Sequence, residues 1–179
     1  MKTQSLRVGL LPDSGKRWTA GVLYVQTITR ALAALPESAR PDMRLLLRSK
    51  DNDPIYDRIT DFTGSSGFYD HVEAKRRSER FKHWRKSLLR HRRPPRYLHE
   101  LAQQQALDLL LPVRTSLGTD FPVPWIGWIP DFQHRHLPEF FTAEDCRKRD
   151  IQFQTLVDEA THLIVSSEET RRDLHQFYQ

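Results

Sequence analysis

The sequence is poor in cysteine and has no long apolar run, and both absences narrow the classes of protein to which it can belong. Its one cysteine, Cys146, excludes an internal disulfide and any zinc site built from several cysteines. We interpret it as a reduced thiol on a helix. No stretch approaches the roughly 18 apolar residues of a membrane-spanning helix. The apolar run near Met1 is too short for a signal peptide, so we expect a cytoplasmic protein.

Two common phosphate-binding fingerprints are also missing. The polar loop at 12–21, PDSGKRWTAG, follows an apolar run and leads into a helical pattern. It contains neither GxGxxG nor a Walker lysine followed by serine or threonine. The free N–H groups at a helix start could still bind a phosphate or a sugar oxygen. The alternative is a surface loop that only caps the helix.

The charge of the chain is concentrated in one segment. The 28 Lys and Arg and 23 Asp and Glu give a formal charge of +5, but residues 75–96 hold eleven of the basic residues and one acid. The rest of the chain has 17 basic and 22 acidic residues, a net of −5. The sequence therefore indicates a mildly acidic domain that carries one basic element, and it does not indicate a protein that wraps nucleic acid.

That basic element, residues 75–93, also carries an apolar stripe. Phe81, Trp84, Leu88 and Leu89 recur at helical spacing among cations such as Arg85. This pattern is typical of a helix that lies in a membrane interface, where anionic headgroups attract the cations. A helix packed on the core with a solvated basic face is the alternative. Nucleic acid is not expected as a partner, because no RNP, KH or zinc-finger pattern accompanies the basic run.

Apolar strands alternate with amphipathic helices along the chain, which predicts a parallel sheet. We expect strands over 6–11, 43–47, 68–72, 109–112, 125–129 and 163–165, helices over 20–35, 54–62, 97–106, 142–160 and 166–178, and a turn over 64–67. The strands are continuous apolar runs, which suits a sheet with helices on both faces. Thr142 with Asp145, and Ser166 with Glu169, have the spacing of capping pairs at two helix starts. The 179 residues suit a single domain.

The densest group of polar residues follows the expected strand at 125–129. Asp131, His134 and His136 lie within six residues of one another, at the end of the strand. These side chains could be metal ligands, or they could contact sugar hydroxyls or a phosphate through paired donors and acceptors. A purely structural loop is the third possibility.

Two segments of the chain resemble group 1 (family 4) glycosyltransferases. WTAGVLYVQT at 18–27, followed by Arg30-Ala31-Leu32, is similar to the first loop and helix of that family. IPDFQHRHLPEFFT at 129–142 and the strand at 163–165, with Ser166-Ser167-Glu168 after it, are similar to the end of the family's N-terminal domain. The likeness spans nearly the whole chain.

The resemblance implies the GT-B architecture, in which two Rossmann-like domains face each other across a cleft. The N-terminal domain holds the acceptor, the C-terminal domain holds the nucleotide-sugar, and a hexosyl group is transferred with retention of configuration. The family uses no bound metal or other cofactor. Its implied partners are a nucleotide-sugar donor and a glycan or lipid-linked acceptor, as in polysaccharide biosynthesis.

The resemblance also implies roles for particular residues. The backbone at Ala20 and Gly21, next to Trp18, would approach the donor phosphate. His134 would touch the transferred sugar while Asp131 positions its loop. His136 is the competing choice for the sugar contact. Arg135 and His136, and Phe81, Trp84, Arg85 and Leu88 of the basic segment, would face the acceptor or the membrane.

The sequence departs from the family at two points. Ala20 replaces the first of two glycines, and no two glutamates lie eight positions apart, although that spacing marks the donor-binding domain. We therefore interpret 1–179 as one Rossmann-like α/β domain, the N-terminal half of a GT-B fold, without its C-terminal donor-binding domain. Alone it would be inactive, because transfer requires that donor and acceptor are held together. We expect it in the cytoplasm, with peripheral contact at the inner membrane face. The alternative is a standalone basic binding module for anionic membrane or nucleic acid.

Overall fold

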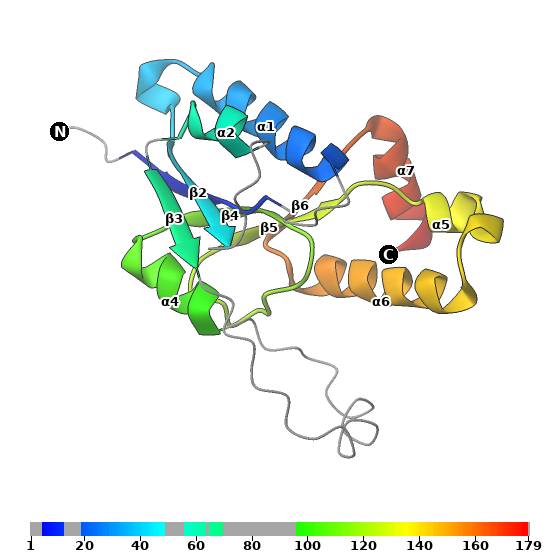
Figure 1. Ribbon diagram of the computed structural model, residues 1–179. Coiled ribbons are helices and arrows are strands. Elements are labelled where there is room, and N and C mark those ends of the chain that lie inside the picture. Colours follow the sequence, from blue (N-terminus) through cyan, green and yellow to red (C-terminus); the bar gives the residue numbers. More distant parts are fainter. Residues whose placement is uncertain (1–4, 13–18, 49–55, 64, 70–95, 179) are drawn as a thin grey trace.

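A six-stranded, all-parallel sheet forms the centre of the molecule (Figure 1). The computed structural model describes residues 5–12, 19–48, 56–63, 65–69 and 96–178. The strands are β1 (Arg7–Leu10), β2 (Asp42–Arg48), β3 (Ser65–Tyr69), β4 (Leu109–Val113), β5 (Trp125–Ile129) and β6 (His162–Val165). Their order in the sheet is β3-β2-β1-β4-β5-β6. The direction of winding reverses between β1 and β4, which is the order of the doubly wound Rossmann type.

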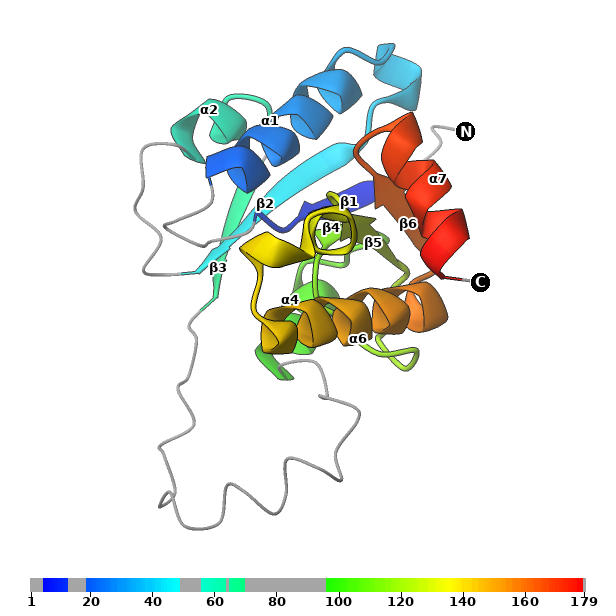
Figure 2. The same ribbon diagram turned by 90° about the vertical axis from the view of Figure 1, so that its right-hand side faces the viewer.

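Helices cover both faces of this sheet (Figures 1 and 2). One face carries α1 (Thr19–Ala33) and α2 (Asp57–Thr60), and the opposite face carries α4 (Arg96–Gln104) and α6 (Ala143–Glu159). The helix α7 (Glu168–Phe177) lies beside β6. Three short helices complete the described chain: η1 (Glu37–Ala39), α5 (Gln133–His136) and η4 (Pro138–Phe140). The expected fold class, a parallel Rossmann-like sheet with helices on both faces, is confirmed.

Two apolar cores lie on the two faces of the sheet, because successive strand residues point to opposite sides. Under α1 and α2 the core contains five residues that are each at most 2% exposed: Val8, Leu10, Val25, Leu45 and Ile59. The core on the other face lies under α4 and α6 and contains Leu110, Trp125, Ile129, Phe132, Phe153 and Leu156. Burial on both faces explains why the strands are continuous apolar runs.

The ends of several elements differ from the expectation. Residues 65–67 were expected in a turn, but they form the start of β3, where Ser65 pairs with Arg44 and Ser66 with Leu45. The strand expected at 68–72 thus begins three residues earlier, at Ser65, and residues 70–72 lie outside the described residues. β3 lies at one edge of the described sheet, next to β2.

The N-cap of α7 is also one residue later than expected. Ser167 Oγ accepts a hydrogen bond from the backbone N–H of Thr170 at 3.1 Å, so Ser167 is the cap. Ser166 Oγ instead accepts a hydrogen bond from the indole Nε1 of Trp128 at 3.2 Å. The expected pair at the start of α6 is confirmed, because Thr142 Oγ accepts from the N–H of Asp145 at 3.1 Å. Among the described helices, none is long and apolar enough to cross a membrane.

Candidate functional site

The polar segment at 131–136 lies at the C-terminal end of β5, the edge of the sheet where doubly wound folds bind ligands. Seen end-on in Figure 2, the short helix α5 stands in front of the strands, with α1 above it, α6 below it and α7 to one side. Asp131 Oδ1 accepts a hydrogen bond from the N–H of Gln133 at 3.2 Å, which turns the chain from the strand into α5.

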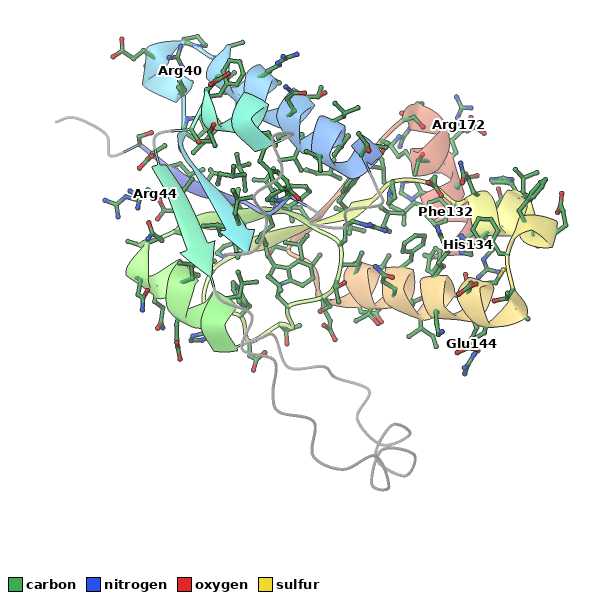
Figure 3. The ribbon with its side chains drawn as sticks, in the orientation of Figure 1. Arg40, Arg44, Phe132, His134, Glu144 and Arg172 are labelled. Atoms are coloured by element: carbon green, nitrogen blue, oxygen red, sulfur yellow. The ribbon has the colours of Figure 1, made fainter. Side chains whose placement is uncertain are left out.

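His134 points from α5 into the interior (Figure 3). The residue is 2% exposed, and its ring lies 5.4 Å from the ring of Phe153 and 6.4 Å from that of Phe141. Its Nε2 lies 2.9 Å from Oδ1 of Asp150 on α6. Its Nδ1 is buried and has no hydrogen-bond partner among the described residues. A sugar cannot reach this ring in the observed conformation, so direct contact between His134 and a sugar is not supported by its placement.

Asp150 joins three elements through one oxygen atom. Besides His134, its Oδ1 is paired with Nε of Arg135 at 2.9 Å and accepts a hydrogen bond from the hydroxyl of Tyr178 at 3.0 Å. Burial raises the pKa of Tyr178 to about 12. The nearby Asp150 carboxylate also raises this pKa, whereas Arg135 lowers it. The phenol therefore stays protonated and acts as a donor to Asp150 up to strongly alkaline pH.

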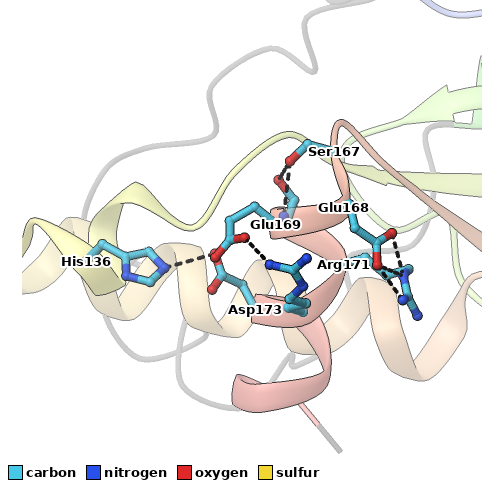
Figure 4. Close-up of polar contacts among 8 residues, drawn as sticks. His136, Ser167, Glu168, Glu169, Arg171 and Asp173 are labelled. Carbon is cyan, nitrogen blue, oxygen red and sulfur yellow. Dashed lines mark hydrogen bonds and ion pairs between the residues drawn. The ribbon is translucent and has the colours of Figure 1, made fainter.

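His136 forms the second histidine–carboxylate pair of α5. Its Nε2 lies 2.9 Å from Oδ2 of Asp173 on α7 (Figure 4). The side chain of His136 is 51% exposed, whereas that of Asp173 is 9% exposed. The ring also meets Phe177 edge-on, with the centroids 5.8 Å apart. α5 is thus attached to α6 through His134 and to α7 through His136.

Two arginines and one carboxylate complete the exposed part of the site. Arg149 lies with its guanidinium 4.8 Å from the ring centroid of Phe141 and 3.8 Å from Asp131 Oδ1. The side chains of Arg149 and Asp131 are 35% and 36% exposed. Arg135 is 39% exposed and lies over the ring of Phe177 at 5.5 Å. The half-exposed polar groups at the end of β5 are therefore Asp131, Arg135, His136 and Arg149.

The structure brings together some of the residues that the sequence singled out, and not others. Asp131, Arg135 and His136 follow the C-terminal end of β5. Because the sheet is parallel, the start of α1 lies at this same end of the strands. There Ala20 is exposed and Gly21 is buried in the first turn of the helix. Five of the expected site residues lie outside the described residues: Trp18, and Phe81, Trp84, Arg85 and Leu88 of the basic segment. Within the described ranges, no three His, Cys, Asp or Glu side chains are grouped to hold a metal ion.

Sequence reasoning missed the two carboxylates that hold α5. Asp150 lies three residues before the buried Phe153, and Asp173 lies four residues before Phe177, so each is on the inward face of its helix. The sequence did contain a signal for them: each is a charged residue at a helix position where the spacing predicts an apolar one. A charge that faces the interior usually has a partner of opposite charge.

Comparisons with known proteins do not assign this chain to a family. No protein-family model matches it, and neither does any curated protein or solved structure. The structure supports a coarser assignment, which is a parallel α/β fold of the Rossmann type with a half-exposed polar site at the C-terminal end of β5.

Proposed function

We propose that this chain is the acceptor-side domain of a GT-B glycosyltransferase. Joined to a donor-binding domain, it would transfer a hexosyl group from a nucleotide-sugar to a glycan or lipid-linked acceptor. The observation that carries the proposal is the position of Asp131, His136 and Arg149, which are half-exposed at the C-terminal ends of the strands in a doubly wound sheet. Ligands of such sheets bind at this edge.

The chemistry of the site favours a neutral polyol over a polyanion. The cationic groups here are already matched by carboxylates: Arg149 by Asp131, Arg135 by Asp150, and His136 by Asp173. Little net positive charge is left to attract a phosphate group. Carboxylate, imidazole and guanidinium groups together still offer both donors and acceptors, and a sugar hydroxyl needs one of each.

The two histidines take different parts in this proposal. His136, which was the competing choice for the sugar contact, is the one whose ring a ligand can reach. His134 would act indirectly, by holding α5 against α6 through Asp150. The first turn of α1, at Ala20 and Gly21, would approach the donor phosphate from this same edge of the sheet. The family resemblance implies that transfer retains the configuration of the sugar.

Salt dependence of binding tests the proposal against a basic binding module. We expect saturation-transfer NMR to detect weak binding of neutral oligosaccharides to the chain, with little change between about 50 and 200 mM salt, because hydrogen bonds dominate. Binding to anionic vesicles or single-stranded nucleic acid through the basic segment would instead fall steeply over that range. Absence of oligosaccharide binding together with salt-sensitive binding to vesicles or nucleic acid would contradict the proposal.

A further inference from the structure

The two histidine–carboxylate pairs of α5 have opposite burial. In the first pair the ring of His134 is 0% exposed and the carboxylate of Asp150 is 30% exposed. In the second the ring of His136 is 51% exposed and the carboxylate of Asp173 is 9% exposed. A solute can therefore reach the imidazole only in the second pair, where the carboxylate lies behind the ring.

The contact with Asp173 determines which nitrogen of a neutral His136 carries the proton. An ionised carboxylate only accepts hydrogen bonds, so the nitrogen at 2.9 Å, Nε2, must be the donor. Nδ1 then carries a lone pair. In the described part of the chain, no other hydrogen bond or ion pair of this ring is present, so Nδ1 has no competing partner there.

The surroundings of the pair keep this arrangement in place. Phe177 packs edge-on against the His136 ring, which restricts its rotation. The other charged residues near Asp173 on α7 are matched among themselves, Glu168 with Arg171 and Glu169 with Arg172 (Figure 4). These two arginines are each bound to a glutamate, so His136 is the partner that Asp173 has in this structure.

We propose that Asp173 is a positioning residue that holds neutral His136 in the Nε2–H form and so presents Nδ1 as a hydrogen-bond acceptor to a ligand hydroxyl. This inference rests on the proposed function and deepens it. The ligand class that it selects has a free hydroxyl that can donate to Nδ1, as a neutral saccharide does. A group that only accepts hydrogen bonds, such as an ionised phosphate, gains nothing from a lone pair at that position.

Asp173→Asn tests this role, because an amide can donate as well as accept. An amide N–H bonded to Nε2 would move the imidazole proton to Nδ1, so that the ring offers a donor where it offered an acceptor. Long-range ¹H–¹⁵N spectra of the uniformly labelled chain distinguish the two tautomers. We expect Nε2–H for His136 in the unmodified chain, a shift toward Nδ1–H in Asp173→Asn, and an approximately tenfold loss of oligosaccharide affinity. The matched control is Glu144→Gln, the same carboxylate-to-amide change at an exposed residue of α6, which should leave both the tautomer of His136 and the affinity unchanged.

Three results would refute either the positioning role of Asp173 or the binding of a saccharide, and they can be told apart. Nδ1–H in the unmodified chain would refute the positioning role outright, and this measurement does not depend on whether a variant folds. An unchanged tautomer together with unchanged affinity in a folded Asp173→Asn variant would also refute it. If the unmodified chain binds no oligosaccharide, the proposed function fails and the ligand part of the inference fails with it, while the spectra still decide how Asp173 acts on His136.

Discussion

The imidazole Nε2 of His134 lies 2.9 Å from the Oδ1 of Asp150, and this contact joins the segment after β5 to α6. Because the His134 ring is completely buried, the pair belongs to the interior of the protein. Asp150 also binds Arg135 and Tyr178, so the same carboxylate attaches the last residues of the described chain. These contacts determine where the half-exposed groups of the site lie.

His134→Ala should destabilise the fold far more than His136→Ala. Removing the buried ring leaves a cavity beside Phe153 and takes a partner from Asp150, for an expected loss of about 2–4 kcal/mol in the free energy of unfolding. His136→Ala removes a half-exposed ring, and water can take its place beside the Asp173 carboxylate, so the expected loss is about 1 kcal/mol. Urea denaturation of both variants measures the difference. Equal losses would contradict the interior placement of His134.

Tyr178 should titrate at unusually high pH and should make the fold sensitive to strong alkali. Its pKa in the folded chain is about 12, raised from 10.0. At pH below 10 the phenol is protonated in both states, so its contribution is fully present. Between pH 10 and 12 the unfolded chain loses the proton first, so stability falls as the pH rises. The difference in absorbance near 295 nm between the unmodified chain and Tyr178→Phe isolates this late titration from those of the other tyrosines, among them Tyr24, whose pKa burial also raises. If the step that is lost in Tyr178→Phe lies near pH 10, the phenol is not held against Asp150.

Gly127→Ala should destabilise the sheet, because a methyl group has no room there. An added Cβ would lie 2.7 Å from Cδ2 of Leu163 and 3.2 Å from Cβ of Ala160. Overpacking of this kind costs about 1–3 kcal/mol. The cost should shrink in a Leu163→Ala background, which removes the nearer contact, and a double-mutant cycle measures that coupling. Additive effects would mean that the backbone of β5 relaxes away from β6.

The layout of the sheet was predictable from the sequence, because buried parallel strands must be apolar on both faces. Runs such as Leu109-Leu110-Leu111 and Leu163-Ile164-Val165 therefore identify their strands directly. β3 was harder to locate, since Ser65, Ser66 and Gly67 have the composition of a turn, and it is their pairing with β2 that makes them part of the sheet. Either of two adjacent serines could be the N-cap of α7. Ser166 is bonded instead to Trp128, which lies 38 residues earlier in the chain, and this contact could not be read from the local sequence.

The candidate site was only partly predictable. The segment at 131–136 was identified from its dense polar residues, but nothing within it distinguishes His134 from His136. That distinction comes from Asp150 and Asp173, which lie 16 and 37 residues further along the chain. Which ring is buried depends on how α6 and α7 pack around α5, and local composition does not encode that packing.

Chemical-shift mapping of the ¹⁵N-labelled chain with a neutral oligosaccharide tests whether a sugar binds at the C-terminal end of β5. We expect the amides of residues 131–137 and of the first turn of α1 to shift progressively as the ligand is added, and His136→Ala to weaken these shifts. His134→Ala is unsuitable as the control because it perturbs the fold, so the exposed Lys148→Ala on α6 serves instead and should leave them unchanged. Shifts confined to another surface, or no shifts at millimolar oligosaccharide, would contradict the assignment of a sugar site to the end of β5.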